Sequence, residues 1–174
     1  MHKSKARTVA LTGMLFALAI TLSFLESMIT PFLGLMPAVK IGLSNIVVMY
    51  ALLFLSKKQA WALVLLKALF AFMTRGATAG FLSLCGGVLS LGVLCLLLLL
   101  PVSTTGYIFS AVGALAHNIG QLAGASLVLS SAMAWGYAPV LLISGLIVGY
   151  LTHWLFKTIM PYLSHVFDNS NTKR

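Results

Sequence analysis

Acidic residues are almost absent from this chain of 174 residues, in which Glu26 and Asp168 are the only two. Enzymes that hold magnesium through clustered carboxylates need several acids close together, so that chemistry is excluded here. The chain also lacks a GxxxxGK[ST] phosphate loop, and with it that route to ATP hydrolysis. Charged residues make up 7% of the sequence, whereas soluble domains carry about 25%. These absences exclude a soluble enzyme and predict a chain without catalytic residues.

Cysteine and histidine do not suggest a metal site either. Cys85 and Cys95 lie ten residues apart in one apolar segment, a spacing that fits neither a zinc site nor a CxxC motif. The four histidines are His2, His117, His153 and His165. None of their spacings is typical of metal ligands. We therefore predict that the protein holds no metal and no cofactor.

Hydrophobic residues, in contrast, form 60% of the sequence. A membrane core about 30 Å thick is crossed by about 20 apolar residues of helix, so the chain has room for about five to seven spans. Its 11 basic residues would also suit a nucleic-acid-binding protein. However, they lie between the apolar runs and not along one polar face, which favours a topology signal and no nucleic-acid partner.

Six apolar segments are predicted to be transmembrane helices of a single all-α domain, residues 1–174. They are residues 7–26, 41–56, 59–75, 79–101, 105–131 and 138–159. Two prolines and a glycine predict a loop over residues 27–39. The polar end, residues 166–174, has nothing to bury and is expected to be frayed. Basic residues before the first segment also fit a cleavable signal peptide, but the later spans favour a retained helix.

Six spans place both ends of the chain on one side of the membrane. The basic residues on that side are Lys3, Lys5, Arg7, Lys57, Lys58, Lys157, Lys173 and Arg174. The other side has Lys40 and Arg75. Because cytoplasmic loops are enriched in Lys and Arg, both termini are predicted to be cytoplasmic.

Small residues recur along several of these segments, at spacings that let helices approach closely in lipid. Gly86, Gly120 and Gly124 belong to the fourth and fifth segments, where we expect them to pack helices within the chain. Gly13 and Ala17 belong to the first segment, where packing within the chain and contact with a partner are both open.

A few polar side chains fall within or at the ends of the apolar segments. Polar groups there are costly unless they are paired or line a wet cavity, so each is a candidate for function. Lys67 lies near the middle of the third segment. The fifth segment carries His117, Asn118 and Gln121, and the i, i+4 spacing puts the first and last of these on one helical face.

The outer ends of the segments add Glu26, Lys40, Asn45 and Arg75. A cavity lined by three cations and one carboxylate would favour an anionic ligand, such as a carboxylate or a phosphate. The alternatives are hydrogen bonds between helices for the amides, and snorkelling to the membrane surface for Lys40 and Arg75.

Two stretches resemble a known family. Residues 25–29 (LESMI) and 37–47 (PAVKIGLSNIV) resemble one of its signatures, and residues 113–122 (GALAHNIGQL) resemble another. From about Thr8 to about Lys157 the chain is similar to the Gx transporter family, often labelled heptaprenyl diphosphate synthase component I. Members of this family look like S components of energy-coupling factor (ECF) transporters. Lys67 stands in place of an arginine of the family, which keeps the charge but loses the planar donor fork.

The resemblance implies a six-helix S component in a bacterial cytoplasmic membrane, which captures a small anionic molecule from outside. A vitamin or a precursor of quinones or isoprenoids would fit. The ligand would be held near Glu26, Lys40, Asn45, Lys67, Arg75, His117, Asn118 and Gln121, with residues 28–39 as a lid. The chain would not be an enzyme.

The resemblance also implies partners. An S component docks on a transmembrane coupling subunit and two ATP-hydrolysing subunits, and its first helix meets the coupling subunit through small residues. These map here onto Ala10, Gly13 and Ala17. The family's other label implies an alternative, an accessory membrane subunit of a polyprenyl diphosphate synthase, heptaprenyl in the label, in menaquinone synthesis. A structural membrane protein without a ligand is a third reading.

Overall fold

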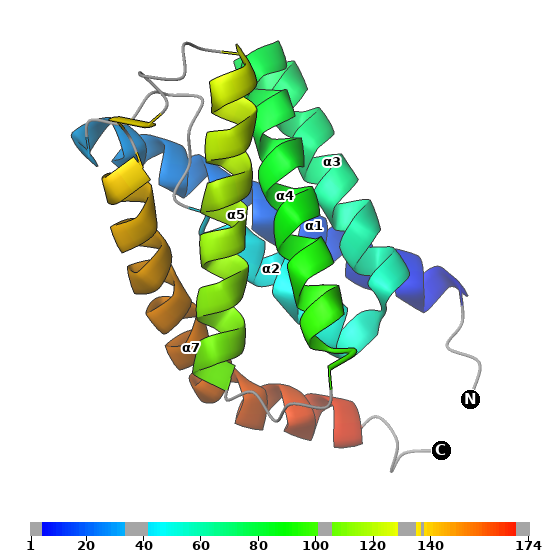
Figure 1. Cartoon of the computed structure of the whole chain (residues 1–174). Helices are drawn as coiled ribbons and strands as arrows, with labels where there is room; N and C mark the ends of the chain where they lie inside the picture. Colours follow the sequence, from blue (N-terminus) through cyan, green and yellow to red (C-terminus); the bar gives the residue numbers. More distant parts are fainter. Residues whose placement is uncertain (1–4, 34–41, 101–105, 129–134, 137, 170–174) are drawn as a thin grey trace.

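The computed structural model describes residues 5–33, 42–100, 106–128, 135–136 and 138–169, and the regular structure in them is helical (Figure 1). The elements are α1 (Lys5–Ile29), the 3-10 helix η1 (Thr30–Leu33), α2 (Asn45–Tyr50), the π-helix η2 (Ala51–Leu55), α3 (Lys57–Arg75), α4 (Ala77–Leu97), α5 (Gly106–Val128) and α7 (Ala138–Asn169). The predicted all-α class is confirmed, because each of the six predicted segments contains a helix.

The ends of α3 are set by two short signals in the sequence. The Ser56 hydroxyl accepts a hydrogen bond from the Gln59 backbone N–H at 3.3 Å, as in an S-x-x-Q capping box. Gly76 ends the helix with a φ of +91°, a conformation that favours glycine, and its N–H donates to the Phe72 carbonyl at 3.1 Å. Helix α3 thus begins and ends close to the breaks between the predicted segments.

The second segment is shorter as a helix than predicted. Helix α2 has 6 residues and η2 adds 5, so together they rise only about 16 Å, about half of a membrane core. The reason is a turn at Gly42, with a φ of +103°, which delays the start of the helix to Asn45. This helix is too short to cross a membrane alone.

The first and last helices are longer than predicted. Helix α1 continues to Ile29 and is followed directly by η1, so the predicted loop begins later, and its residues 34–39 lie outside the described part. Helix α7 continues through Pro161 to Asn169, into the stretch that we expected to be frayed. Its ribbon changes direction before its last, red segment, as a proline inside a helix favours (Figure 1).

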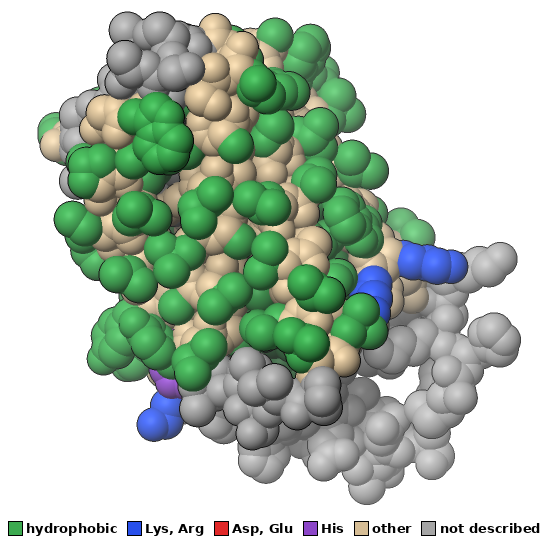
Figure 2. Space-filling model, in the orientation of Figure 1, with side chains coloured by type: hydrophobic (Ala, Val, Ile, Leu, Met, Phe, Trp, Pro, Cys, Tyr) green, Lys and Arg blue, Asp and Glu red, His purple; other side chains and the backbone are tan. Residues whose placement is uncertain are grey.

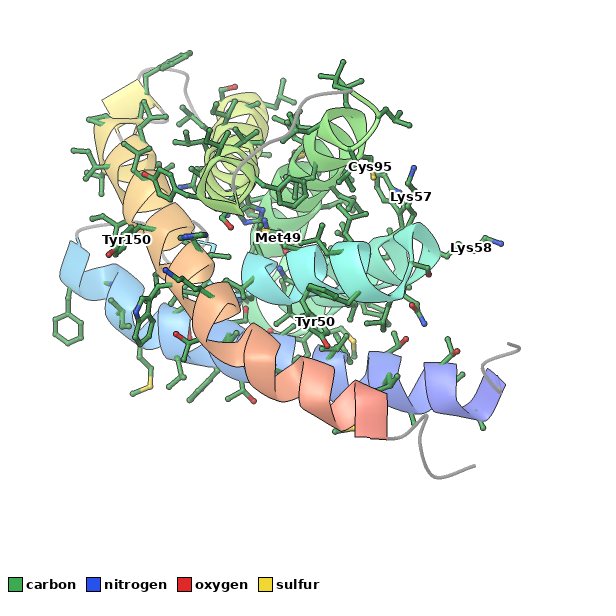
Figure 3. The ribbon with its side chains drawn as sticks, turned by 90° about the horizontal axis from the view of Figure 1, so that it is seen from below. Met49, Tyr50, Lys57, Lys58, Cys95 and Tyr150 are labelled. Atoms are coloured by element: carbon green, nitrogen blue, oxygen red, sulfur yellow. The ribbon has the colours of Figure 1, made fainter. Side chains whose placement is uncertain are left out.

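Helices α3, α4, α5 and α7 lie side by side, with α4 against both α3 and α5, and α5 against α7 (Figure 1). Helix α1 crosses behind them, and α2 lies between α1 and the α4–α5 pair (Figures 1 and 3). Helix α1 packs mainly on α2 and α3, and only 6% of its apolar span is buried. Most of its surface therefore faces outward.

The apolar core fills the end of the bundle where α3 begins. Met49 of α2 lies at its centre (Figure 3), together with Leu63 of α3 and Leu91 and Leu94 of α4, and all four are buried. Burying such a side chain stabilises a protein by about 1.5–3 kcal/mol. The opposite end of the bundle, toward Arg75, carries the polar groups described below.

The outer surface is also apolar. Exposed apolar side chains such as Met14, Phe24, Leu69 and Ile147 come from three helices, and Figure 2 shows side chains of this kind over the visible face. Soluble monomers rarely expose apolar patches of this extent. Two helices, Thr8–Ile29 and Ala77–Leu97, are long and apolar enough to cross a membrane. Both observations support a membrane location.

Basic side chains gather at one end of the bundle. Lys57 and Lys58 at the start of α3 and Lys157 of α7 are exposed. Figure 3 shows the first two pointing away from the helices, and in Figure 2 the Lys and Arg side chains of the visible face lie near this end. Arg75 lies at the opposite end of α3. These four residues are divided between the two ends as the sequence predicted, and the other basic residues of that prediction lie outside the described side chains.

Candidate functional site

Glycines let α4 and α5 approach closely at the level of the polar residues. A Cβ atom on Gly120 would lie 2.6 Å from the Cys85 carbonyl oxygen and 2.8 Å from the Gly86 Cα. A Cβ on Gly86 would lie 2.8 Å from the His117 carbonyl oxygen and 2.9 Å from the Gln121 Cγ. No side chain fits at either position, so the prediction of packing within the chain is confirmed. This crossing fixes where His117 and Gln121 project.

A small polar cavity lies between α1, α3, α4 and α5, beside the turn before α2. Its cationic lining is Lys67 and Arg75. The other polar residues that line it are Ser23, Ser44, Ser83, His117 and Gln121. Within the described part of the chain, Ala79 is the one apolar residue in the lining. The cavity volume is about 10 Å³, enough for about one water molecule, so a larger ligand needs the lining side chains to move apart.

Lys67 and Arg75 direct two positive charges at this cavity. They are eight residues apart on α3, about 12 Å along its axis, and their long side chains reach the same space. Lys67 is buried, with 9% of its surface exposed. Arg75 is half-buried, and its buried Nη1 atom has no hydrogen-bond acceptor among the described residues. The pair therefore offers donors to a bound molecule.

Among the described side chains, Glu26 supplies the negative charge that acts on this pair. Its carboxylate acts electrostatically on both Lys67 and Arg75. Within the described part of the chain, two cations against one carboxylate leave one positive charge in excess. A buried charge without a counter-charge is costly in apolar surroundings, so the site favours an anion.

The same Glu26 side chain holds the turn that leads into α2. Its Oε1 atom accepts hydrogen bonds from the backbone N–H groups of Gly42 and Leu43, the second at 3.4 Å. A Cβ on Gly42 would lie 3.0 Å from the His117 Cδ2 atom, and the positive φ also favours glycine. Glu26 thus shapes one wall of the site through the backbone, and a direct contact of its side chain with a ligand stays a prediction.

His117 and Gln121 form a buried pair on one face of α5, as their spacing predicted. The distance between their Nε2 atoms is 2.7 Å. The two side chains are therefore hydrogen-bonded to each other inside the bundle, and the direction of this bond follows the tautomer of the ring.

Two of the predicted site residues connect helices. Asn45 of α2 donates to the Ser90 hydroxyl of α4 at 2.8 Å, and Ser90 donates to the Gly113 carbonyl of α5, also at 2.8 Å. Asn118 of α5 donates to the Leu141 carbonyl of α7 at 2.6 Å. These bonds are the structural alternative that the sequence left open for the amides. A ligand contact for either residue stays a prediction.

The structure thus brings together four of the predicted substrate-binding residues, Lys67, Arg75, His117 and Gln121. Lys40 lies outside the described residues, as do residues 34–39 of the predicted lid. Sequence reasoning missed the three serines of the lining, Ser23, Ser44 and Ser83. Ser23 and Ser83 lie in helices and Ser44 in a turn, and a serine in either place commonly bonds the nearby backbone, so the residue type alone gives little signal.

The predicted partner face on α1 is open. Ala10, Gly13 and Ala17 are all exposed. A Cβ on Gly13 would have nothing within 4 Å among the described residues. No described helix covers this face, which leaves it to lipid or to a partner.

Comparison with known families matches residues 15–159 to the family described as heptaprenyl diphosphate synthase component I. This match confirms the family resemblance of the sequence. No curated protein matches the chain, and no solved structure does.

Proposed function

Because the chain belongs to the heptaprenyl diphosphate synthase component I family, we propose that it is a multi-pass membrane subunit that binds a small anion at Lys67 and Arg75. It acts in this proposal as the S component of an ECF-type importer and carries out no chemistry itself. The observation behind it is the pair of cations facing a polar cavity, since ionisable groups at membrane depth mark ligand or ion pathways. A purely structural role would not offset the cost of burying them.

The charge distribution suggests the orientation of the chain. We place the end with Lys57, Lys58 and Lys157 in the cytoplasm, because cytoplasmic segments are enriched in basic residues. Arg75, at the other end of α3, then lies near the outer surface. The ligand enters from that side and reaches Lys67 deeper in the bundle.

The open face of α1 is the proposed contact with the coupling subunit. Helices in lipid approach closely through small residues, and Ala10, Gly13 and Ala17 are small and exposed. The coupling subunit would connect the chain to two ATPase subunits, which supply the energy for release of the ligand inside the cell.

A second candidate is favoured by the family description itself. It is an accessory membrane subunit of a heptaprenyl diphosphate synthase, whose partner would be a soluble, acid-rich synthase subunit. This role needs a surface for that partner and gives no reason for a buried cationic cavity. The family description therefore favours the second candidate, and the cavity favours the first.

Affinity purification of the tagged chain from its native membranes separates the two candidates. The transport proposal expects the coupling subunit and both ATPases in the eluate. Gly13→Leu should lose them without unfolding the chain, because Gly13 is exposed and a Cβ atom there meets no described atom within 4 Å. Ala123→Leu, at an exposed position of α5, is the matched control and should keep them. An eluate with a synthase subunit and no ATPase, unchanged by Gly13→Leu, would contradict the transport proposal.

A further inference from the structure

The lining and the charge of the cavity point to a narrower class of ligand. Resting on the proposed function, we infer that the cavity selects a small, water-soluble monocarboxylate and rejects prenyl diphosphates. Three features of the cavity favour this class of ligand: the residue types of the lining, the charges around it, and the donor groups of Arg75.

The residue types exclude a long apolar ligand. Sites for apolar molecules are lined mainly by aliphatic and aromatic side chains. Here the described lining combines two cations, three serines, a histidine and a glutamine with a single alanine, Ala79. A prenyl chain placed against these groups would separate them from water without replacing their hydrogen bonds, which is costly. A ligand with hydroxyl, carbonyl or amide groups would satisfy them.

The count of charges distinguishes a carboxylate from a diphosphate. Among the described Lys, Arg, Asp and Glu side chains around the cavity, Lys67 and Arg75 are opposed by Glu26, so one positive charge remains. A monoanion neutralises the site. A diphosphate carries more negative charge than the site can balance, and the excess would be buried without a partner.

The donors suit a carboxylate as well. The Arg75 guanidinium presents a planar fork of N–H groups, whose geometry matches the two oxygens of a carboxylate. Its buried Nη1 atom has no acceptor among the described residues. Lys67 adds a charge deeper in the bundle, and the hydroxyls of Ser44 and Ser83 remain for the uncharged part of the ligand.

Competition among defined probes tests the charge class. The purified full chain in lipid nanodiscs is incubated with glycerate, gluconate, malate, glycerol 3-phosphate and geranyl diphosphate at equal concentrations, and the bound masses are read by native mass spectrometry. We expect the bound amount of a monocarboxylate, glycerate or gluconate, to exceed that of malate, glycerol 3-phosphate and geranyl diphosphate by about tenfold. This ratio is equivalent to about 1.4 kcal/mol of binding free energy. Arg75→Gln should abolish this retention, and Lys58→Gln, which removes an exposed cation from the same helix, should not.

Glu26→Gln then tests the count of charges. Its amide oxygen still accepts from Gly42 and Leu43, so the turn is kept while one negative charge is removed. The site gains a second excess positive charge, and its preference should move to malate and glycerol 3-phosphate. Unchanged selection in Glu26→Gln would overturn the inference.

The outcomes distinguish this inference from the proposed function. Retention of geranyl diphosphate that is lost in Arg75→Gln would overturn the ligand class and leave anion binding intact. If no probe is retained in a way that depends on Arg75 or Lys67, both the ligand class and the proposed binding function are wrong.

Discussion

The close crossing of α4 and α5 leads to a prediction for Gly120→Ala. The added methyl group would lie 2.6 Å from the Cys85 carbonyl oxygen and 2.8 Å from the Gly86 Cα, and neither backbone atom can rotate away. Overpacking of this kind costs about 1–3 kcal/mol, while exchanging a helical glycine for alanine returns up to about 1 kcal/mol. We therefore expect the free energy of unfolding to fall by about 1–2 kcal/mol.

Gly92→Ala is the matched control. It makes the same exchange on α4, where the added methyl group has nothing within 4 Å. This variant should be neutral or more stable by up to about 1 kcal/mol. A difference of about 2 kcal/mol between the variants corresponds to about 4–8 °C in Tm, measured by thermal unfolding in one detergent. If Gly120→Ala unfolds at or above the temperature of Gly92→Ala, the helices do not cross in backbone contact, and the cavity geometry that depends on this crossing is wrong.

Two further predictions concern a buried hydrogen bond and the orientation of α3. Ser90→Ala removes the acceptor of the Asn45 amide and should lower the free energy of unfolding by about 1–3 kcal/mol, measured by thermal unfolding. Ser126→Ala, which removes an exposed hydroxyl bonded within its own helix, should change little, and equal losses would contradict the reasoning. With both native cysteines replaced by serine, an impermeant maleimide should label Ala77→Cys in intact cells but Lys58→Cys only after permeabilisation. The reverse pattern would invert the orientation, and labelling of both in intact cells would mean that α3 does not cross the membrane.

The positions of the helices could be predicted from the sequence, because long apolar runs and their breaks are local signals. Ser56 and Gly76 illustrate this, since each acts on backbone groups within four residues of itself. The short second helix could not be predicted in the same way. Its start depends on Gly42, whose backbone conformation is held by Glu26, a residue 16 positions earlier in the chain.

The candidate site could be predicted in part. The cost of burying polar groups singled out Lys67, Arg75, His117 and Gln121, and these do share one cavity. The same rule selected Asn45 and Asn118, whose amides bond other helices. Spacing along the sequence places a residue on a helix but does not say which neighbouring helix its side chain meets. An amide that lines the cavity could therefore not be distinguished from one that bonds another helix.

Glu26 performs two tasks with one carboxylate, which has a consequence for evolution. Its oxygen fixes the turn at Gly42, and its charge sets the balance beside Lys67. Exchange to glutamine separates these tasks, because the amide keeps an acceptor and gives up the charge. Exchange to aspartate does the opposite, because the shorter side chain keeps the charge and withdraws the acceptor. A substitution at position 26 can therefore change the charge at the cavity during evolution while the turn at Gly42, and with it the fold, is kept.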